Sequence, residues 1–283
     1  MCNYNVFYKI NEKFKVIKCE ECGFWHVYPY PDDEILDIFY KKDYSDNLKK
    51  HNLFRKVNYF KNKKIDNILD IGCGNGELLD EFKKYGFKTY GIEPSEKAFL
   101  YAKKNHEVIN SPLKENLFER KFNLISLNFV LEHVKHPYNF MKNILNNFLE
   151  KEGYLLIEIP NDFSEFQIIY HVNNHIGNDL PYWVHFPDHL NYWNFNTFND
   201  FIKKLNLKIN FQTSTFPLEM FLLYGDDYIK DSEKGSIIHK KRLNFEENII
   251  KAKGLEYLSD FYTYLSKRNV GRTIEVILER VEK

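Results

Sequence analysis

Between residues 65 and 160 the chain alternates short apolar runs with segments whose apolar residues recur at helical spacing. Five strands separated by helices within about a hundred residues predict a parallel sheet with right-handed crossovers. Such a sheet binds ligands beyond the carboxyl ends of its strands, so functional residues are expected just after each strand. The expected strands are Ile65–Ile71, Lys88–Ile92, Val108–Ile109, Phe122–Phe129 and Gly153–Ile159.

The segment before this pattern predicts a separate N-terminal appendage over residues 1–64. A pair of short strands is expected over Phe14–Tyr28, and Pro29 and Pro31 end it. Asp32–Tyr40 has apolar residues at helical spacing and predicts a helix.

The segment after the pattern completes a main domain over residues 65–283, with further strands expected over Lys208–Thr215 and Thr273–Val281. Two long inserts interrupt it, at 161–195 and at 217–272, and the second is predicted to be mostly helical. Inserts of this length in a compact domain are usually functional, so we expect them to line a binding site.

Charge and hydropathy exclude several classes of function. Lys and Arg together number 40, as do Asp and Glu, so the chain is a poor candidate for binding nucleic acid through its phosphates. No run approaches the roughly 18 apolar residues of a membrane span, and the first residues lack the apolar core of a signal peptide. The four cysteines fit a cytoplasmic protein with reduced thiols.

The loop Asp70–Gly76, with the sequence Asp-Ile-Gly-Cys-Gly-Asn-Gly, is the sharpest local signal. It follows an expected strand and opens an expected helix. Glycines there allow a tight turn and let backbone N–H groups approach a ligand closely. The pattern alone also fits a plain turn, but Glu93 ends the next strand about 20 residues later, where an acidic side chain can accept both hydroxyls of a ribose.

The blocks Tyr182–Trp193 and Thr215–Tyr228 resemble those of a bacterial methyltransferase subgroup that tailors small molecules and surface sugars. Three further segments together resemble successive motifs of the class I S-adenosylmethionine-dependent methyltransferases. They are Asp70–Gly76, Gly91-Ile-Glu-Pro-Ser95, and Asn128-Phe-Val-Leu-Glu-His133 with Pro137. The resemblance covers roughly residues 65–160. It implies a doubly wound, Rossmann-like α/β fold with a seven-stranded sheet whose last strand is antiparallel.

The resemblance also implies how S-adenosyl-L-methionine is bound. Gly72 and Gly74 would line its methionine part, Glu93 its ribose, and Ser111 its adenine edge. Asn128, Phe129 and Val130 would lie at the sulfonium side. The full set of expected cofactor-binding residues is Asp70, Gly72, Cys73, Gly74, Gly76, Glu93, Pro94, Ser111, Asn128, Phe129, Val130 and His133.

A dinucleotide site is the main competitor on the same fold. It usually has the pattern Gly-x-Gly-x-x-Gly, whereas the third glycine of this loop, Gly76, falls one position early. The spacing therefore favours the methyl donor over NAD.

Cys19-Glu-Glu-Cys22-Gly23 resembles half of a zinc ribbon. A structural zinc needs four Cys or His ligands, and Cys2 and His26 are poorly spaced to complete the set. We therefore predict a degenerate ribbon that binds no metal. Its fold would depend on apolar packing instead.

The run from Tyr182 to Trp193 places several polar side chains after the fifth strand, where the methyl acceptor is expected. His189 is the first choice for a general base, because histidine is largely neutral near pH 7 and can take a proton. His185 and Asp188 are the other catalytic candidates. Because neighbouring side chains diverge on a strand, Asp188 is expected to orient a group other than His189.

The expected reaction is O-methylation of a sugar or nucleotide-sugar, of the kind found in bacterial capsule or lipopolysaccharide biosynthesis. A hydroxyl is a weak nucleophile and needs a base, which the histidine-rich run supplies. The alternatives are N- or C-methylation of another small metabolite, and a cofactor-binding protein that has lost catalysis. A homodimer is compatible with the sequence, which does not fix the oligomeric state.

Overall fold

The computed structural model describes residues 4–36, 53–174, 180–229 and 231–281. They divide into two compact units. Of the described residues, the sheet unit comprises 53–158, 203–210 and 276–281, and the insert unit comprises 4–36, 159–174, 180–202, 211–229 and 231–275.

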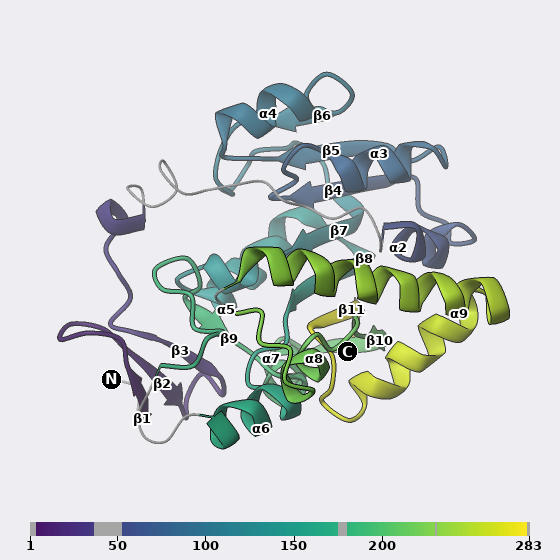
Figure 1. Cartoon of the computed structure of the whole chain (residues 1–283). Helices are drawn as coiled ribbons and strands as arrows, with labels where there is room; N and C mark the ends of the chain where they lie inside the picture. Colours follow the sequence, from purple (N-terminus) through teal and green to yellow (C-terminus); the bar gives the residue numbers. More distant parts are fainter. Residues whose placement is uncertain (1–3, 37–52, 175–179, 230, 282–283) are drawn as a thin grey trace. The chain divides into compact units, whose positions relative to one another are not determined.

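Seven strands form one sheet in the order β10-β11-β8-β7-β4-β5-β6, with the last strand of the chain antiparallel (Figure 1). The α/β fold predicted from the sequence is thereby confirmed. The order in which successive strands are added to the sheet reverses at β4, whose neighbours are β5 and β7. Ligands of such sheets bind at this switch point. The bounds are β4 (Asn67–Ile71), β5 (Lys88–Ile92), β6 (Glu107–Ile109), β7 (Phe122–Asn128), β8 (Leu149–Pro160), β10 (Leu207–Thr213) and β11 (Thr273–Arg280).

The central strands are buried on both faces, as continuous apolar runs in parallel sheets usually are. Ile71 of β4 lies opposite Ile92 of β5 and Leu127 of β7, so the carboxyl ends of three strands are in register. Packing on this sheet explains why the short helices form. α3 buries Leu78, Leu79 and Phe82 against β4 and β5.

The other helices of the sheet unit are also short. α2 packs on α3, and α4 packs on β6. Their bounds are α2 (Leu53–Phe60), α3 (Glu77–Lys83), α4 (Glu96–Ala102), η2 (Leu131–His133), α5 (Pro137–Asn143) and the π-helical turn η3 (Ile144–Phe148).

Most predicted strands differ from the observed ones only at their ends. The largest difference is β8, which begins at Leu149 and not at Gly153. Leu149 pairs with Phe122 ahead of a register shift, so the polar residues 150–152 are accommodated inside the strand.

The insert unit contains a separate four-stranded sheet in the order β1-β2-β3-β9. β1 (Tyr4–Lys9), β2 (Lys15–Cys19) and β3 (Trp25–Tyr28) follow one another, and β9 (Asn191–Tyr192) pairs with β3 through Trp25 and Tyr192. The predicted strand pair is confirmed. Residues 33–36 are helical, and the rest of the helix predicted to Tyr40 lies outside the described residues.

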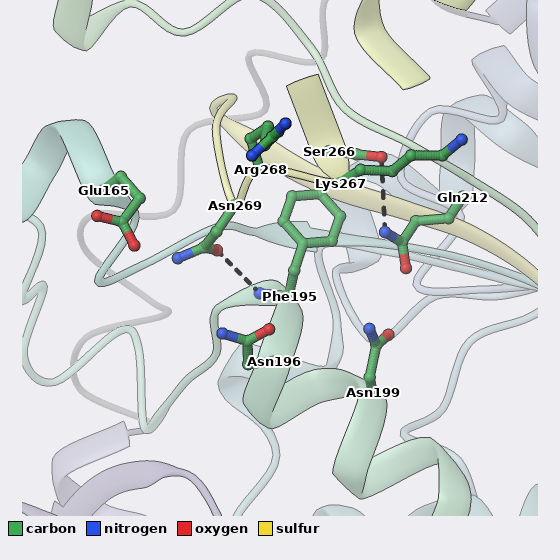
Figure 2. A pocket seen from close by; sticks show the side chains of 9 residues that line it. All are labelled: Glu165, Phe195, Asn196, Asn199, Gln212, Ser266, Lys267, Arg268 and Asn269. Carbon is green, nitrogen blue, oxygen red and sulfur yellow. Dashed lines mark hydrogen bonds between the residues drawn. The ribbon is translucent and has the colours of Figure 1, made fainter. Parts of the chain in front are cut away.

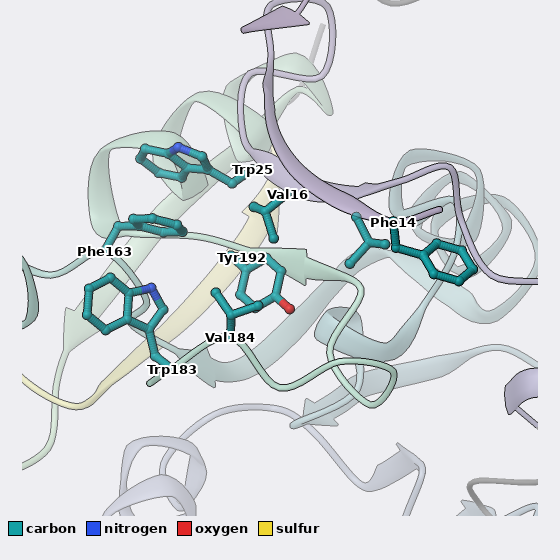
Figure 3. Close-up of a cluster of buried hydrophobic side chains, with 8 residues drawn as sticks. Phe14, Val16, Trp25, Phe163, Trp183, Val184 and Tyr192 are labelled. Carbon is teal, nitrogen blue, oxygen red and sulfur yellow. The ribbon is translucent and has the colours of Figure 1, made fainter. Parts of the chain in front are cut away.

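The core of this unit joins the N-terminal strands to the first insert. Figure 3 shows Trp25 stacked on Phe163, with ring centroids 4.4 Å apart, next to Trp183 and Tyr192. Phe14 and Val16 belong to the same cluster. Residues 4–36 thus share a sheet and a core with residues 163–192, while the predicted domain boundary at residue 64 stays a prediction.

The second insert is mostly helical, as predicted. It contains α8 (Glu219–Leu223) and α9 (Ser232–Ser266), which is interrupted at Gly254, where φ is 86°. Glu246, before this interruption, accepts hydrogen bonds from Arg242 in the same half (2.9 Å) and from the hydroxyl of Tyr262 in the other half (2.7 Å). The second bond links the two halves of α9. The helices α6 (Glu165–Asn174) and α7 (Phe195–Lys204) come before the second insert in the chain. Among the described residues, no helix is both long and apolar enough to cross a membrane.

Candidate functional site

The glycine loop of the sheet unit leaves β4 in a left-handed conformation. Gly72, Gly74 and Gly76 have φ of 73°, 53° and 84°, a region that side chains strain. A Cβ on Gly72 would lie 2.9 Å from Cγ2 of Val130, so the loop and the end of β7 approach too closely for any larger residue. The backbone conformation therefore favours glycine at all three positions.

Glu93 fixes the loop from the end of β5. Its Oε2 accepts the N–H of Gly74 (2.8 Å), and its Oε1 accepts the N–H of Ser95 (2.7 Å). The residue is buried, with 3% exposed. A carboxylate oxygen has two lone pairs, so each can still accept a ligand hydroxyl in addition to a backbone N–H.

Asp70 begins the loop as a buried carboxyl. Ser126 donates its hydroxyl to Asp70 Oδ1, and Asn128 also hydrogen-bonds the carboxyl. Burial raises the pKa of Asp70 from its ordinary 3.8 to about 7, although the bond from Ser126 and the charge of Lys56 lower it. Asp70 can therefore change its charge near neutral pH.

The end of β7 carries the next predicted residues. Phe129 adopts φ of 53°, and its N–H donates to the Glu158 carbonyl (2.8 Å). Val130 accepts the N–H of His133 (3.0 Å), which starts the turn η2. Phe129, Val130 and His133 are each half-buried, so this segment can present them to a ligand.

The structure adds a residue that the sequence did not indicate. The Nζ atom of Lys56, in α2, donates to Oδ1 of Asn128 and to Oε2 of Glu158, both at 2.5 Å. Neither a motif nor charge patterning pointed to Lys56, because only the folded chain brings α2 to the end of β7.

The segment after β6 contains Ser111, the residue expected at the adenine edge, and that role stays a prediction. β6 ends at Ile109, so Asn110 follows it directly, and its amide donates to the carbonyls of Glu93 (2.8 Å) and Pro94 (3.1 Å). The Ser111 hydroxyl instead donates to the Pro112 carbonyl (2.8 Å). Asn110 is the polar side chain that borders this edge of the loop.

Two further predicted residues have supporting roles. Cys73 is buried, and its Sγ would lie 2.7 Å from a Cβ on Gly91, so loop and strand pack without a gap. Pro94 is exposed and follows Glu93 at the rim. The predicted cofactor-binding residues thus gather at the ends of β4, β5, β6 and β7, and they fit an adenosyl ligand with a ribose and charged groups.

The predicted catalytic residues lie together in the insert unit. The backbone N–H of His189 donates to the His185 carbonyl (2.7 Å), so residues 185–189 form a turn. The imidazole centroids of His185 and His189 are 5.4 Å apart. Because the backbone turns, Asp188 Oδ2 comes within 3.9 Å of His189 Nε2. A separation of 3.9 Å is longer than a hydrogen bond, so the expectation that Asp188 orients another group stays a prediction.

A second polar cluster of the insert unit lies around Glu219. Oε1 of this buried carboxylate accepts the Tyr182 hydroxyl (3.1 Å) and a guanidinium N–H of Arg272 (3.3 Å). Burial, and then the charge of Glu219, raise the pKa of Tyr182, so its hydroxyl stays protonated. Desolvation and Arg272 lower the pKa of His185, which keeps that imidazole neutral and able to accept a proton near pH 7.

The cysteine pair forms a turn that could hold a metal. Cys22 N–H donates to Cys19 Sγ (3.3 Å), and Gly23 N–H donates to the Cys19 carbonyl (2.8 Å). One donor atom each of Cys19, Cys22 and His26 lies within 4.8 Å of the others. Sequence spacing had not placed His26 this near, and Cys2 lies outside the described residues. The absence of metal stays a prediction.

A cavity of about 430 Å³ lies in the insert unit between α7 and the end of α9 (Figure 2). Two of the amide side chains that line it bond within the protein. Asn269 accepts the N–H of Phe195 (3.2 Å), and Gln212 donates to Ser266 (3.5 Å). None of the predicted site residues lines it.

The sequence of the chain was compared with those of known protein families. The sequence profile of a family described as a methyltransferase domain matches residues 41–210, more than half of the chain. The chain belongs to this methyltransferase family. The predicted class I methyltransferase is confirmed, with S-adenosyl-L-methionine as the methyl donor of the class.

Curated relatives match only part of the chain. The ubiquinone biosynthesis O-methyltransferase of Schizosaccharomyces pombe, a mitochondrial protein, is 30% identical over 103 residues, which are 33% of this chain and 36% of the relative. That of Glaesserella parasuis is 30% identical over 107 residues, 33% of this chain and 45% of the relative. The chain therefore spans less than half the length of these relatives.

Solved structures share the fold of the methyltransferase. Coclaurine N-methyltransferase bound to N-methylheliamine and SAH is 14% identical, with a TM-score of 0.50 over 84% of this chain and 76% of that one. Identity this low supports the architecture alone.

Proposed function

We propose that this methyltransferase transfers a methyl group from S-adenosylmethionine to a hydroxyl of a small polar acceptor, with a sugar or nucleotide-sugar as the acceptor class. The observation that carries the proposal is the grouping of His185, Asp188 and His189 in one turn of the insert unit. The curated relatives are also O-methyltransferases.

The residues of the sheet unit would hold the donor. Gly72 and Gly74 leave room for its methionine part, Glu93 would accept the ribose hydroxyls, and Asn110 borders the adenine edge. When bound, S-adenosylmethionine supplies a methyl group on a positively charged sulfur. The protein must align the acceptor oxygen with that methyl and exclude water.

The insert unit would supply the proton acceptor. A hydroxyl becomes a better nucleophile as its proton leaves, and a neutral imidazole within hydrogen-bond reach can take it. His189 would act as this base, with Asp188 stabilising the imidazolium that results. His185 is the second choice, because desolvation and Arg272 keep it neutral.

Two experiments test the proposal at different levels. S-adenosylmethionine should raise the melting temperature of the protein and NAD should not, because a ligand that binds only the folded state stabilises it. A panel of nucleotide-sugars, free sugars, phenols and amines is then incubated with the methyl-labelled donor. Label on a sugar oxygen supports the proposal, whereas label on nitrogen or carbon replaces it with the alternative.

A cofactor-binding protein without turnover is the remaining alternative. It would bind the donor but release no S-adenosylhomocysteine with any acceptor. The cytoplasmic location, the bacterial capsule or lipopolysaccharide context and a homodimer stay predictions of the sequence.

A further inference from the structure

Lys56 is a buried lysine that the proposed chemistry does not use. Its side chain is 2% exposed, and its ammonium contacts Glu158 and Asn128 at 2.5 Å each. Glu158 lies near the carboxyl end of β8, and its side chain is 7% exposed. A charge pair this deeply buried loses much of its hydration.

The buried ion pair of Lys56 and Glu158 is not expected to stabilise the folded state by much. Replacing a buried ion pair by apolar residues of similar volume is often neutral or stabilising, because desolvation offsets the Coulombic attraction. Lys56 therefore calls for another explanation, and its neighbours provide one.

The contacts of Lys56 continue to the donor loop. Oδ1 of Asn128 accepts from Lys56, so the amide nitrogen of Asn128 is the atom left to bond the Asp70 carboxyl. Ser126 donates to the same carboxyl. An unbroken series of polar contacts thus runs from Glu158 through Lys56 and Asn128 to Asp70, across the ends of β8, β7 and β4.

We propose that Lys56 is a positioning residue for the methyl donor, which fixes the Asn128 amide and keeps the Asp70 carboxylate ionised beside the glycine loop. This inference rests on the donor site proposed above. An ionised Asp70 would favour a ligand that carries an ammonium group, as both S-adenosylmethionine and S-adenosylhomocysteine do.

Burial is the largest influence on Asp70 and raises its pKa, and the groups around the carboxyl act in both directions. Lys56 from α2 favours the carboxylate, and Glu93 from the end of β5 disfavours it. The hydrogen bonds from Ser126 and Asn128 of β7 favour it as well. Because Lys56 is the one cation among these groups in the described chain, its removal should move Asp70 towards the protonated form.

The test measures binding of S-adenosylhomocysteine to the full chain by calorimetry between pH 6 and pH 9. We expect the affinity of the wild type to rise with pH and to level off above about pH 7, where Asp70 becomes ionised. Lys56→Met should shift this midpoint to higher pH and weaken binding at pH 7 about tenfold, the scale of a lost hydrogen bond to a charged group.

Three variants distinguish a positioning role from a merely structural one. Lys56→Arg keeps the cation and should restore the wild-type midpoint. Asp70→Asn should make the profile flat, because the titrating group is gone. Lys64→Met, at an exposed lysine that follows the same helix, should leave the profile unchanged.

The outcomes separate the two proposals. A wild type that binds S-adenosylhomocysteine at no pH overturns the donor site and this inference with it. Binding by Lys56→Met with an unchanged midpoint overturns the role of Lys56 alone, even if its melting temperature falls. If Lys56→Met does not fold, a pH step that survives in Asp70→Asn overturns the inference.

Discussion

The two units hold their polar residues in different ways. In the sheet unit, the Glu93 carboxylate fixes the donor loop through its backbone, since it accepts the N–H groups of Gly74 and Ser95. In the insert unit, side chains far apart in the sequence hold each other, as Tyr182, Glu219 and Arg272 do. The first arrangement follows from sheet topology, whereas the second depends on how long inserts fold.

This difference indicates which part can vary. The donor loop has three glycines at positive φ, and they cannot be exchanged without strain. A cluster of side chains on inserts can be rebuilt for another acceptor while the sheet stays unchanged. The donor site should therefore respond to few substitutions but strongly, and the acceptor side should set specificity.

The largest effect is expected at the insert unit. His189→Ala should lower turnover about 10²–10⁴-fold, the usual contribution of a general base, and leave donor affinity nearly unchanged. Rates with an identified acceptor and calorimetry with S-adenosylhomocysteine measure the two effects. His239→Ala, on α9 of the same unit, is the matched control. Retention of more than about a tenth of the turnover would exclude His189 and favour amine methylation.

Glu93→Ala tests the backbone-held site. It should weaken donor binding by about 1–3 kcal/mol, because hydrogen bonds to a charged group are lost and Gly74 loses its acceptor. Isothermal titration with S-adenosylhomocysteine gives the value. An affinity equal to that of the wild type would show that Glu93 does not contact the ligand.

Gly72→Ala separates strain from contact. Its left-handed φ of 73° and the 2.9 Å approach to Val130 should together weaken donor binding by at least about tenfold, since each strained position costs on the order of 1–3 kcal/mol. Gly86→Ala is the control, because φ there is 85° but no atom lies within 4 Å. Equal losses of binding in both variants would contradict a specific role for Gly72.

Asp70 should make stability depend on pH in an unusual direction. A carboxyl whose pKa is raised from 3.8 to about 7 binds its proton more tightly in the folded state, so stability falls as pH rises from about 4 to 7 and then levels off. Asp70→Asn removes this loss. Its melting temperature relative to the wild type should therefore increase between pH 5 and pH 8, and a constant difference would refute the assignment.

The cysteine turn should have the smallest effect of all. Cys19, Cys22 and His26 supply three donors in the described part of the chain, and a structural zinc requires four. We expect elemental analysis to find less than one zinc per chain. Stoichiometric zinc that is lost in Cys19→Ser would reverse this prediction.

The grouping of the candidate donor residues could be predicted because they follow strands directly, and a short loop has little freedom once the strand is placed. The hydrogen bonds of Asn110 to the carbonyls of Glu93 and Pro94 were not predicted, since the strand before it has only three residues and its end is hard to place from sequence. Lys56 and Glu219 were not predicted, because their importance comes from partners about 70 to 100 and about 40 to 50 residues away. Local periodicity contains no information on such contacts.

The pairing of Trp25 with Tyr192 has a consequence for how the chain is made. A strand near the start finds its last partner only after residue 192 has left the ribosome. Until then Trp25 lacks the aromatic residues that cover it, among them Phe163 and Trp183. Contacts between residues this distant in sequence form slowly and leave apolar surface open to aggregation. The nascent N-terminal strands are therefore the part of this chain that most needs protection during synthesis.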